Sequence, residues 1–176
     1  MEESSRIDHF TVGIHLETIS IGKFSSIGRS NWITGFPIGT KSRHFIHEKE
    51  RKPELIIGKH SAITKNHHID CTNKIIIGDF TTVAGYNSQF LTHSINIYTN
   101  RQESNPIIIG DYNFIGTNVT ILGGSTLPNY SVLGAKSLLN KKFNDEYALY
   151  GGNPAIKIKN LPKDSKYFLR KTGFVL

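Results

Sequence analysis

The sequence predicts an all-β solenoid, in which short strands wind into stacked triangular coils. Between residues 107 and 139 an aliphatic side chain returns at every sixth position, and a residue of modest size stands four places after five of them. This period fits neither an amphipathic helix, at about 3.6 residues per turn, nor a plain two-residue strand alternation. The aliphatic positions are Ile109, Ile115, Ile121, Leu127, Leu133 and Leu139, and the modest ones are Asn113, Val119, Ser125, Ser131 and Ser137.

A six-residue side consists of a short strand and a tight corner, and three such sides close one triangular coil. Every eighteenth residue then stacks on the same edge, and the narrow interior has room for one aliphatic side chain per side. Gly110, Gly116 and Gly134 directly follow three of the aliphatic residues, and glycine supplies corner dihedrals that other residues reach only with strain. Parallel ladders about 4.8 Å apart would satisfy the backbone between coils.

The composition is consistent with one domain that has an anionic partner. The chain has 176 residues, a hydrophobic fraction of 38% and a formal net charge of +7, and such a basic balance favours a nucleotide cofactor, an acidic glycan or nucleic acid. Cys71 is the only cysteine, so no intrachain disulfide can form. The acidic, polar N-terminus does not read as a signal peptide, and no apolar run approaches the roughly 20 residues that span a bilayer. We therefore expect a cytoplasmic protein without a membrane span.

The N-terminal third starts the repeat and then interrupts it. Residues 7–18 alternate apolar and polar, which predicts an opening strand that covers the edge of the first coil. Sixes begin at Ile21, Ile27 and Ile33. Thr40–Glu54 is rich in charge, and we expect it to be a solvated surface excursion between coils, because charge clusters usually face solvent.

A second interruption divides the later repeats. Sixes resume at Ile57, Ile63 and Ile69, and after two extra residues they continue at Ile77 and Val83. The next inward position by this count is Gln89, a polar residue, and the pattern does not return until Ile109. We expect the chemistry in this interruption, because an unbroken solenoid has no obvious way to form a pocket.

The repeat ends at Leu139, which divides the chain into a β-helix region, 1–140, and a C-terminal connector and cap, 141–176. Lys163–Leu176 carries several aromatic residues. We expect this segment to be a short helical or extended cap over the open edge of the last coil, because an uncapped parallel edge invites aggregation.

The stacked sixes, together with Thr-His-Ser-Ile at residues 92–95 and Gly-Gly-Asn-Pro-Ala at residues 151–155, resemble the hexapeptide-repeat acyltransferase family. The likeness is greatest to the polysaccharide and galactoside O-acetyltransferases. The resemblance implies a left-handed β-helix with a protruding loop, here near 95–106, after a histidine that acts as general base. That position is occupied by His93, and histidine suits the role because its pKa lies near neutrality. The resemblance further implies acetyl-CoA as co-substrate, no metal, and homotrimers with active sites between subunits.

The resemblance also assigns residues to the cofactor, position by position. Small residues match those that flank the pantetheine arm, two residues after the repeats match the pyrophosphate or adenosine end, and a basic pair matches the 3′-phosphate. Lysines suit phosphate oxygens as mobile point charges. In that order the residues are Thr117 and Ala135, Asn140 and Lys141, and Lys157 and Lys159.

The acceptor-binding residues are predicted from residues 64–70 and from Gln89, the polar residue at an inward position of the repeat. Asn66 matches a position at which sugar-acetylating relatives hydrogen-bond their acceptor, and His68 and Asp70 share its strand face by the two-residue period. Gln89 could point toward the same place. Cys71 is a rival nucleophile, but its context gives no sign of a lowered pKa, and we interpret it as a passive cysteine.

These observations predict an acetyl-CoA-dependent O-acetyltransferase that acts on a sugar hydroxyl of a cell-envelope or capsular glycan or its precursor. N-acetylation of an amino sugar or a small antibiotic is the alternative within the enzyme class. A non-catalytic glycan-binding solenoid is the alternative outside it. A γ-class carbonic anhydrase would need three zinc-binding histidines, yet no histidine follows His93, and a nucleic-acid partner lacks any recognisable motif.

Overall fold

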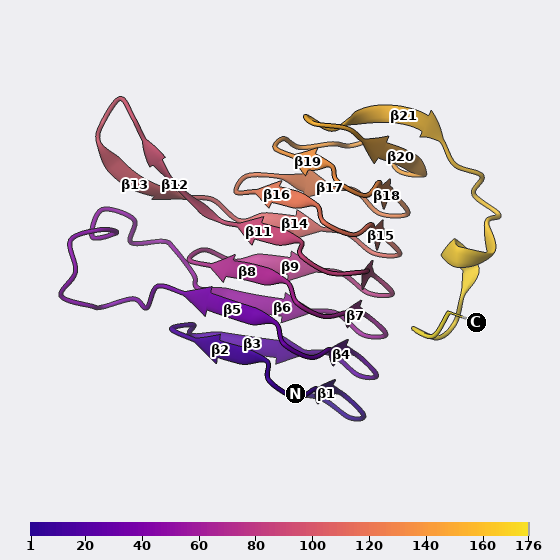
Figure 1. Cartoon of the computed structure of the whole chain (residues 1–176), viewed down its shortest axis with the longest axis horizontal. Helices are drawn as coiled ribbons and strands as arrows, with labels where there is room; N and C mark the ends of the chain where they lie inside the picture. Colours follow the sequence, from indigo (N-terminus) through magenta and orange to yellow (C-terminus); the bar gives the residue numbers. More distant parts are fainter. Residues whose placement is uncertain (176) are drawn as a thin grey trace.

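The computed structural model describes residues 1–175, and its strands form the three walls of a triangular prism (Figure 1). Wall A holds β1 (Arg6–Ile7), β4 (Ser26–Ile27), β7 (Ala62–Ile63), β10 (Thr82–Val83), β15 (Phe114–Ile115), β18 (Val132–Leu133), β20 (Ala148–Gly151) and β21 (Ile156–Asn160). Wall B holds β2 (Val12–Ile14), β5 (Trp32–Gly35), β8 (His68–Cys71), β11 (Gln89–Leu91), β16 (Thr120–Leu122) and β19 (Leu138–Leu139). Wall C holds β3 (Thr18–Ile21), β6 (Glu54–Ile57), β9 (Ile75–Ile77), β14 (Ile107–Ile109) and β17 (Thr126–Leu127).

The core is a set of columns of inward side chains, and the expectation of one aliphatic residue per side is wrong for wall C. There a second column, Leu55, Ile75 and Ile107, runs beside that of Ile57, Ile77 and Ile109. The parallel register places inward residues of successive coils directly over one another, as for Ile33 on Ile69 and Ile63 on Val83. All six aliphatic residues predicted between 109 and 139 are fully buried. The repeat therefore predicted this part of the core correctly.

Polar residues of modest size form a second kind of column at a corner between walls. Ser61 Oγ donates to the carbonyl oxygen of Gly78 at 2.7 Å, and the Thr81 amide donates back to Ser61 Oγ at 2.9 Å. One coil further on, the Asn113 amide donates to Thr81 Oγ1 at 3.0 Å. These side chains satisfy backbone groups that the tight corner leaves without a ladder partner.

The expected inward position of Gln89 is wrong by one residue. Phe90 is the fully buried residue of β11 and pairs with Ile69 below it and Ile121 above it, whereas Gln89 is exposed. The corner after Val83 contains one residue more than a regular side, and Gly85 adopts a φ of +72° there. This left-handed conformation is open to glycine without strain, so the corner absorbs the extra residue and shifts the phase.

The first coil begins earlier than the sixes indicated. Instead of covering an edge, β2 forms the first strand of wall B and pairs in parallel with β5. Gly13 occupies its inward position opposite Ile33, so the apolar residues Val12 and Ile14 of the predicted alternation lie on the outward side.

Two insertions leave the prism at the edge between walls B and C (Figure 1). The first, which we call the excursion, comprises residues 36–53 and connects β5 to β6. The second is an antiparallel hairpin of β12 (His93–Asn96) and β13 (Arg101–Ser104), placed between β11 and β14. Both project from the same side of the molecule, and the corner of one intervening coil lies between them.

The predicted cap lies within residues 141–176 but not at Lys163–Leu176, where we expected it. The open edge of the last coil is closed by β21, which pairs antiparallel with β20. The 3-10 turn η1 (Lys166–Leu169) and the tail after it run back along the outside of the coils (Figure 1). Tyr167 donates to the carbonyl oxygen of Asn113 at 2.9 Å, and the Gly173 amide contacts His60 Nδ1 at 3.3 Å. Leu176, the last residue of the predicted cap, lies outside the described residues. No helix in the part of the chain that the structure describes is long and apolar enough to cross a membrane.

The corrected register predicts very different costs for two adjacent alanine substitutions. Phe90→Ala removes a fully buried ring and leaves a cavity, so we expect the free energy of unfolding to fall by about 3–5 kcal/mol. Gln89→Ala removes an exposed side chain and should change it by no more than about 0.5 kcal/mol. Urea unfolding of both variants measures the difference. Equal losses would contradict the register in which Phe90, and not Gln89, faces the core.

Candidate active site

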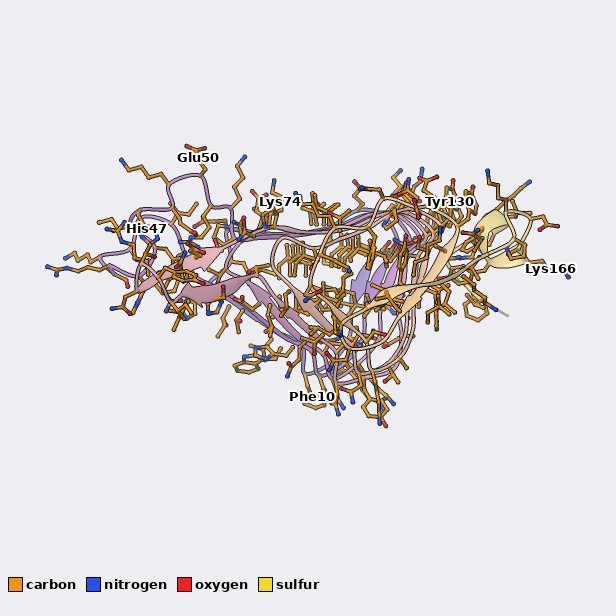
Figure 2. All side chains as sticks on the ribbon, turned by 90° about the horizontal axis from the view of Figure 1, so that it is seen from above. Phe10, His47, Glu50, Lys74, Tyr130 and Lys166 are labelled. Atoms are coloured by element: carbon orange, nitrogen blue, oxygen red, sulfur yellow. The ribbon has the colours of Figure 1, made fainter. Side chains whose placement is uncertain are left out.

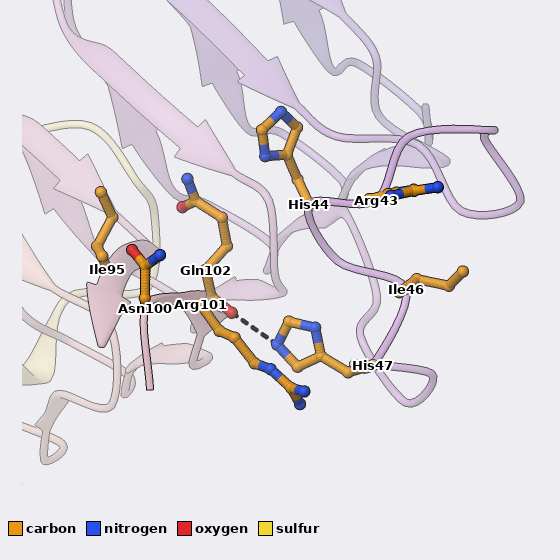
Figure 3. Close-up of a pocket in the computed structure, with 8 residues that line it drawn as sticks. All are labelled: Arg43, His44, Ile46, His47, Ile95, Asn100, Arg101 and Gln102. Carbon is orange, nitrogen blue, oxygen red and sulfur yellow. Dashed lines mark hydrogen bonds between the residues drawn. The ribbon is translucent and has the colours of Figure 1, made fainter. Parts of the chain in front are cut away.

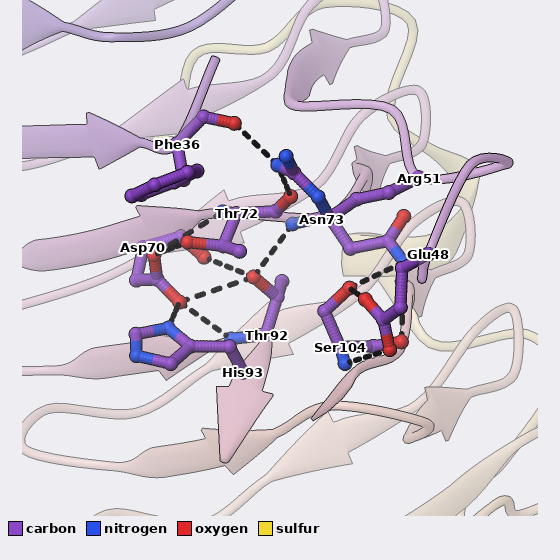
Figure 4. Close-up of polar contacts among 9 residues, drawn as sticks. All are labelled: Phe36, Glu48, Arg51, Asp70, Thr72, Asn73, Thr92, His93 and Ser104. Carbon is purple, nitrogen blue, oxygen red and sulfur yellow. Dashed lines mark hydrogen bonds and ion pairs between the residues drawn. The ribbon is translucent and has the colours of Figure 1, made fainter. Parts of the chain in front are cut away.

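The candidate site lies where the chain leaves wall B and enters the hairpin (Figure 4). His93 is the first residue of β12, and its Nδ1 lies 2.7 Å from Oδ2 of Asp70 on β8. The imidazole is 43% exposed, whereas the Asp70 side chain is only 7% exposed. Part of the imidazole ring therefore remains open to a substrate, while the carboxylate behind it is shielded from water.

Asp70 is fixed by four further hydrogen bonds. Its Oδ1 accepts from the amide and the hydroxyl of Thr72, at 3.1 and 2.7 Å. Its Oδ2 accepts from the amide and the hydroxyl of Thr92, both at 3.1 Å. Asp70 has the same outward parity on β8 as His68, opposite the inward Ile69, as the two-residue period predicted. Both of its oxygens are nevertheless engaged within the protein, so it supports His93 and is not open to an acceptor. A signal for this was present, because a threonine two residues after an aspartate can donate back to its carboxylate.

The electrostatics of the pair favour an ionised carboxylate and a basic imidazole. Burial opposes ionisation of Asp70, but the hydrogen bonds from His93 and Thr72 outweigh it and hold the pKa of Asp70 below its usual value. The hydrogen bond to Asp70 raises the pKa of His93 above 6.5 against an opposing effect of burial. An ionised carboxylate only accepts, so Nδ1 carries the proton in the neutral ring. The Nε2 lone pair is then the free base of the site.

The excursion covers Asp70 through a buried arginine. The guanidinium of Arg51 donates to the carbonyl oxygens of Phe36 and of Thr72, the latter at 2.8 Å, and lies 4.7 Å from the centroid of the Phe45 ring. Burial lowers the pKa of Arg51, and Glu48 is the strongest of the carboxylates that oppose this. The prediction that the charged residues of this segment face solvent is therefore wrong for Arg51. Its hydrogen bond to Thr72 attaches the excursion to the coil that carries Asp70.

The excursion and the hairpin also contact each other around His93. Phe45 meets the His93 ring edge to face, with the centroids 6.0 Å apart. The carboxylate of Glu48 accepts from the Ser104 amide at 2.8 Å and from the Ser104 hydroxyl. Asn73, at the corner of the coil between the two insertions, donates to Ser104 Oγ at 3.1 Å. These contacts position both insertions on the solenoid and on each other.

Three of the four residues predicted for the acceptor share a shallow pocket on the outer face of wall B. Asn66, His68 and Gln89 line this pocket of about 400 Å³. Trp32, which the sequence reasoning did not single out, lines it as well and is 49% exposed. An exposed tryptophan at an outward strand position was the available signal, because an aromatic face among polar groups is typical of ligand sites.

The adjacent His67 points the other way and belongs to the structural corner. Its Nε2 lies 3.0 Å from Thr64 Oγ1, and its Nδ1 accepts from the Ser88 amide at 3.1 Å. Burial lowers the pKa of His67 to about 4, so the ring is neutral. Within residues 1–175 no group of three or more His, Cys, Asp or Glu side chains is arranged to hold a metal ion.

The residues predicted for the cofactor fall into separate places. Thr117 and Ala135 stack at the corner between walls A and B, because the coils that carry them pair through β15 and β18. Asn140 and Lys141 follow β19 at the edge between walls B and C, on the same edge as His93. The two pairs are therefore separated by the width of wall B.

Lys157 and Lys159 lie exposed on β21 at the end of the solenoid, and Lys157 Nζ forms an ion pair with Asp145 at 2.8 Å. Cys71 is fully buried, and burial raises the pKa of its thiol well above the usual value. A buried thiol in this state is a poor nucleophile, which agrees with its interpretation as passive.

No family model matches the chain. It is 32% identical over 139 residues to YvoF of Bacillus subtilis (strain 168), to which an acetyltransferase activity is provisionally assigned, and the match spans 77% of this chain and 70% of that protein. A hexapeptide-repeat-containing acetyltransferase of Vibrio cholerae O1 biovar eltor, solved with acetyl coenzyme A, is 27% identical with a TM-score of 0.64 over 80% of this chain and 70% of its own.

The likeness of fold extends to more distant structures. A galactoside acetyltransferase in complex with coenzyme A is 18% identical with a TM-score of 0.55, over 96% of this chain and 71% of its own. Identity of 32% to the Bacillus protein over more than two thirds of both chains, on the coil architecture described above, establishes the relationship. The chain belongs to the hexapeptide-repeat acyltransferase family, and its solenoid is the left-handed β-helix of that family.

Proposed function

We propose that the protein is an acetyl-CoA-dependent O-acetyltransferase that acts on a sugar hydroxyl of a cell-envelope or capsular glycan or its precursor. The observation that carries the proposal is the hydrogen bond between His93 Nδ1 and Asp70 Oδ2, which leaves Nε2 as a base toward solvent. The Vibrio and galactoside enzymes bound to acetyl coenzyme A or coenzyme A support the donor.

In the proposed reaction His93 Nε2 removes the proton of the acceptor hydroxyl as its oxygen attacks the thioester carbonyl. Asp70 stabilises the imidazolium that forms and holds the ring in one tautomer. The C–S bond then breaks, and the departing thiolate takes the proton from His93. Both substrates react while bound together, so no covalent enzyme intermediate is needed.

The donor is proposed to bind along the later coils. Thr117 and Ala135 form a corner of small side chains on which a pantetheine arm could lie without steric obstruction. Exposed basic residues lie further along, and they suit the phosphates of coenzyme A. These residues are Lys141, Lys157 and Lys159, with Asn140 beside the first of them.

The acceptor is proposed to approach from the earlier coils. The pocket of Asn66, His68 and Gln89 offers polar groups for hydroxyl recognition, and the exposed face of Trp32 suits the apolar face of a sugar ring. Asn66 lies at the same corner between walls A and B as Thr117 and Ala135, so an acceptor in this pocket would reach His93 across the outer face of wall B.

We also propose a cytoplasmic homotrimer with active sites between subunits. The hairpin tip supports this arrangement, because Ile97 and Tyr98 there are 80% and 93% exposed and nothing in the single chain covers them. Large apolar side chains that project on a hairpin are typical of a contact with another subunit.

The proposed base predicts a large loss of activity from one substitution. His93→Ala should lower kcat for acyl transfer by about 100- to 10,000-fold, because general base catalysis contributes that much. Thiol release from acetyl-CoA in the presence of a panel of sugars and amino sugars measures it. His9→Ala, at an exposed histidine of the first coil, is the matched control, and Cys71→Ser should keep full activity. Wild-type turnover in His93→Ala would eliminate the base, and loss of activity in a folded Cys71→Ser would restore the covalent route.

The Asp70–His93 hydrogen bond predicts the pH dependence. Because this bond raises the pKa of His93, the base is protonated and kcat/KM falls as the pH drops through a value above 6.5. Asp70→Asn removes the negative charge, so this descent should move to lower pH and the plateau should fall by at least about tenfold. Profiles of kcat/KM for both proteins, with an NMR titration of the His93 ring, measure the two effects. A descent at unchanged pH in Asp70→Asn would contradict this assignment.

A further inference from the structure

A second cavity opens between the excursion and the hairpin (Figure 3). It has a volume of about 470 Å³. We call it the inter-loop cleft. Its lining comprises Arg43, His44, Ile46, His47, Ile95, Asn100, Arg101 and Gln102.

The walls of the inter-loop cleft are held together by bonds between the two insertions. His47 Nε2 donates to the carbonyl oxygen of Gln102 at 2.8 Å. Beside the cleft, Glu48 accepts from the amide and hydroxyl of Ser104. These contacts join chain segments more than fifty residues apart, so the cleft is a built feature of the fold.

The lining of the cleft is basic. It contains two arginines and two histidines and no Asp or Glu. The two acidic residues that come nearest in sequence are engaged elsewhere, since Glu48 binds Ser104 and Glu103 accepts from Asn96 Nδ2. Within residues 1–175, neither Arg43 nor Arg101 forms an ion pair. Two guanidinium groups without a carboxylate partner are therefore available to a ligand.

The cleft lies next to the site of His93. Ile95 lines it and lies two residues after His93 on the same face of β12, about 6.6 Å along the strand. A chain of aromatic contacts makes the second connection. The rings of His44 and Phe36 lie 6.2 Å apart, those of Phe36 and Phe45 5.1 Å, and those of Phe45 and His93 6.0 Å.

We propose that the inter-loop cleft binds an anionic group of the acceptor, a carboxylate or a phosphate carried by the sugar that His93 deprotonates. The inference rests on the proposed function and specifies its substrate class. Arginine presents a planar fork that matches both oxyanions with paired hydrogen bonds. Gln102 adds a contact for the sugar itself, because its Oε1 is buried without a hydrogen-bond partner and can accept from a sugar hydroxyl. A neutral sugar would leave the two guanidinium groups without a partner.

The test compares a double variant, Arg43→Gln with Arg101→Gln, against a control with the same loss of charge. Lys166→Gln with Lys171→Gln is that control, because this tail lies at the opposite end of the molecule from His47 (Figure 2). The acceptors are neutral sugars paired with their anionic counterparts, glucose with glucuronate, galactose with galacturonate, and glucose with glucose 1-phosphate. The readouts are thiol release from acetyl-CoA and binding of each sugar by ligand-observed NMR.

The wild type and the control should prefer the anionic member of at least one pair by about tenfold or more, in kcat/KM and in binding. The double variant should lose this preference while its KM for acetyl-CoA and its turnover of neutral sugars stay unchanged. The preference should also weaken with added salt. The uronates and the phosphate identify which oxyanion the cleft takes.

Three results would overturn the proposal. Equal binding of neutral and anionic sugars by the wild type would show that the cleft does not select charge. A preference that survives in the double variant would place the anion elsewhere. A raised KM for acetyl-CoA in the double variant would assign the cleft to a phosphate of the donor. Absence of thiol release with every acceptor would instead contradict the proposed function, and the binding arm would still decide the proposal on the cleft.

Discussion

The narrowness of the prism is the constraint on which the rest of this structure depends. Each side of a coil can bury only one or two large side chains, and each strand inside the stack is paired with the coil above and the coil below. Additional residues therefore cannot be taken into the interior and must leave at a corner. Gly85 shows the smallest case, one residue absorbed by a left-handed corner. The excursion and the hairpin are the large cases, and both leave at the edge between walls B and C.

That shared exit creates the site. The corner of the intervening coil carries Asp70 and Thr72, and the two insertions close over it from either side. A carboxylate in such a place is stable only if its oxygens are satisfied, since the charged form is penalised by burial. Thr72, Thr92 and His93 provide the donors. Arg51 is stabilised by carbonyl oxygens and by the Phe45 ring, although its buried Nε has no hydrogen-bond partner.

The periodic part of this architecture could be predicted from the sequence, because a six-residue repeat is a local property that reports directly on burial. The inward positions of the later coils followed from it, and so did the location of His93 beside an insertion, but the second buried column of wall C did not. The position of Gln89 could not be predicted, because one inserted residue shifts the phase without any change in composition. The burial of Arg51 was equally hidden, because its partners are backbone carbonyls that carry no sequence signal.

The C-terminal tail was misplaced for a related reason. Its aromatic residues correctly indicated that it packs on the solenoid, but its location depends on a column of rings from separate coils. Tyr130 and Tyr147 stack with centroids 4.6 Å apart, and Phe168 meets both edge to face. Such a column exists only once the coils are in register, so the tail finds its binding surface on the side of the finished solenoid and not on the open edge.

His93 lies where wall B joins the hairpin, so the catalytic base and the residues that would select the acceptor are on different parts of the molecule. Asp70 belongs to β8, whose register is set by the buried columns, and Thr92 and His93 directly follow β11 of the same wall, so the base is held at the rigid part of the molecule. The groups that would meet the acceptor lie on the outer face of wall B and on two insertions with few buried apolar residues. Loops of this kind tolerate substitution, whereas the columns do not. The same base can therefore be kept while substitutions change the charge of the surrounding cleft. In this chain, Arg43 and Arg101 of the inter-loop cleft are the residues proposed to set the preference for an anionic acceptor.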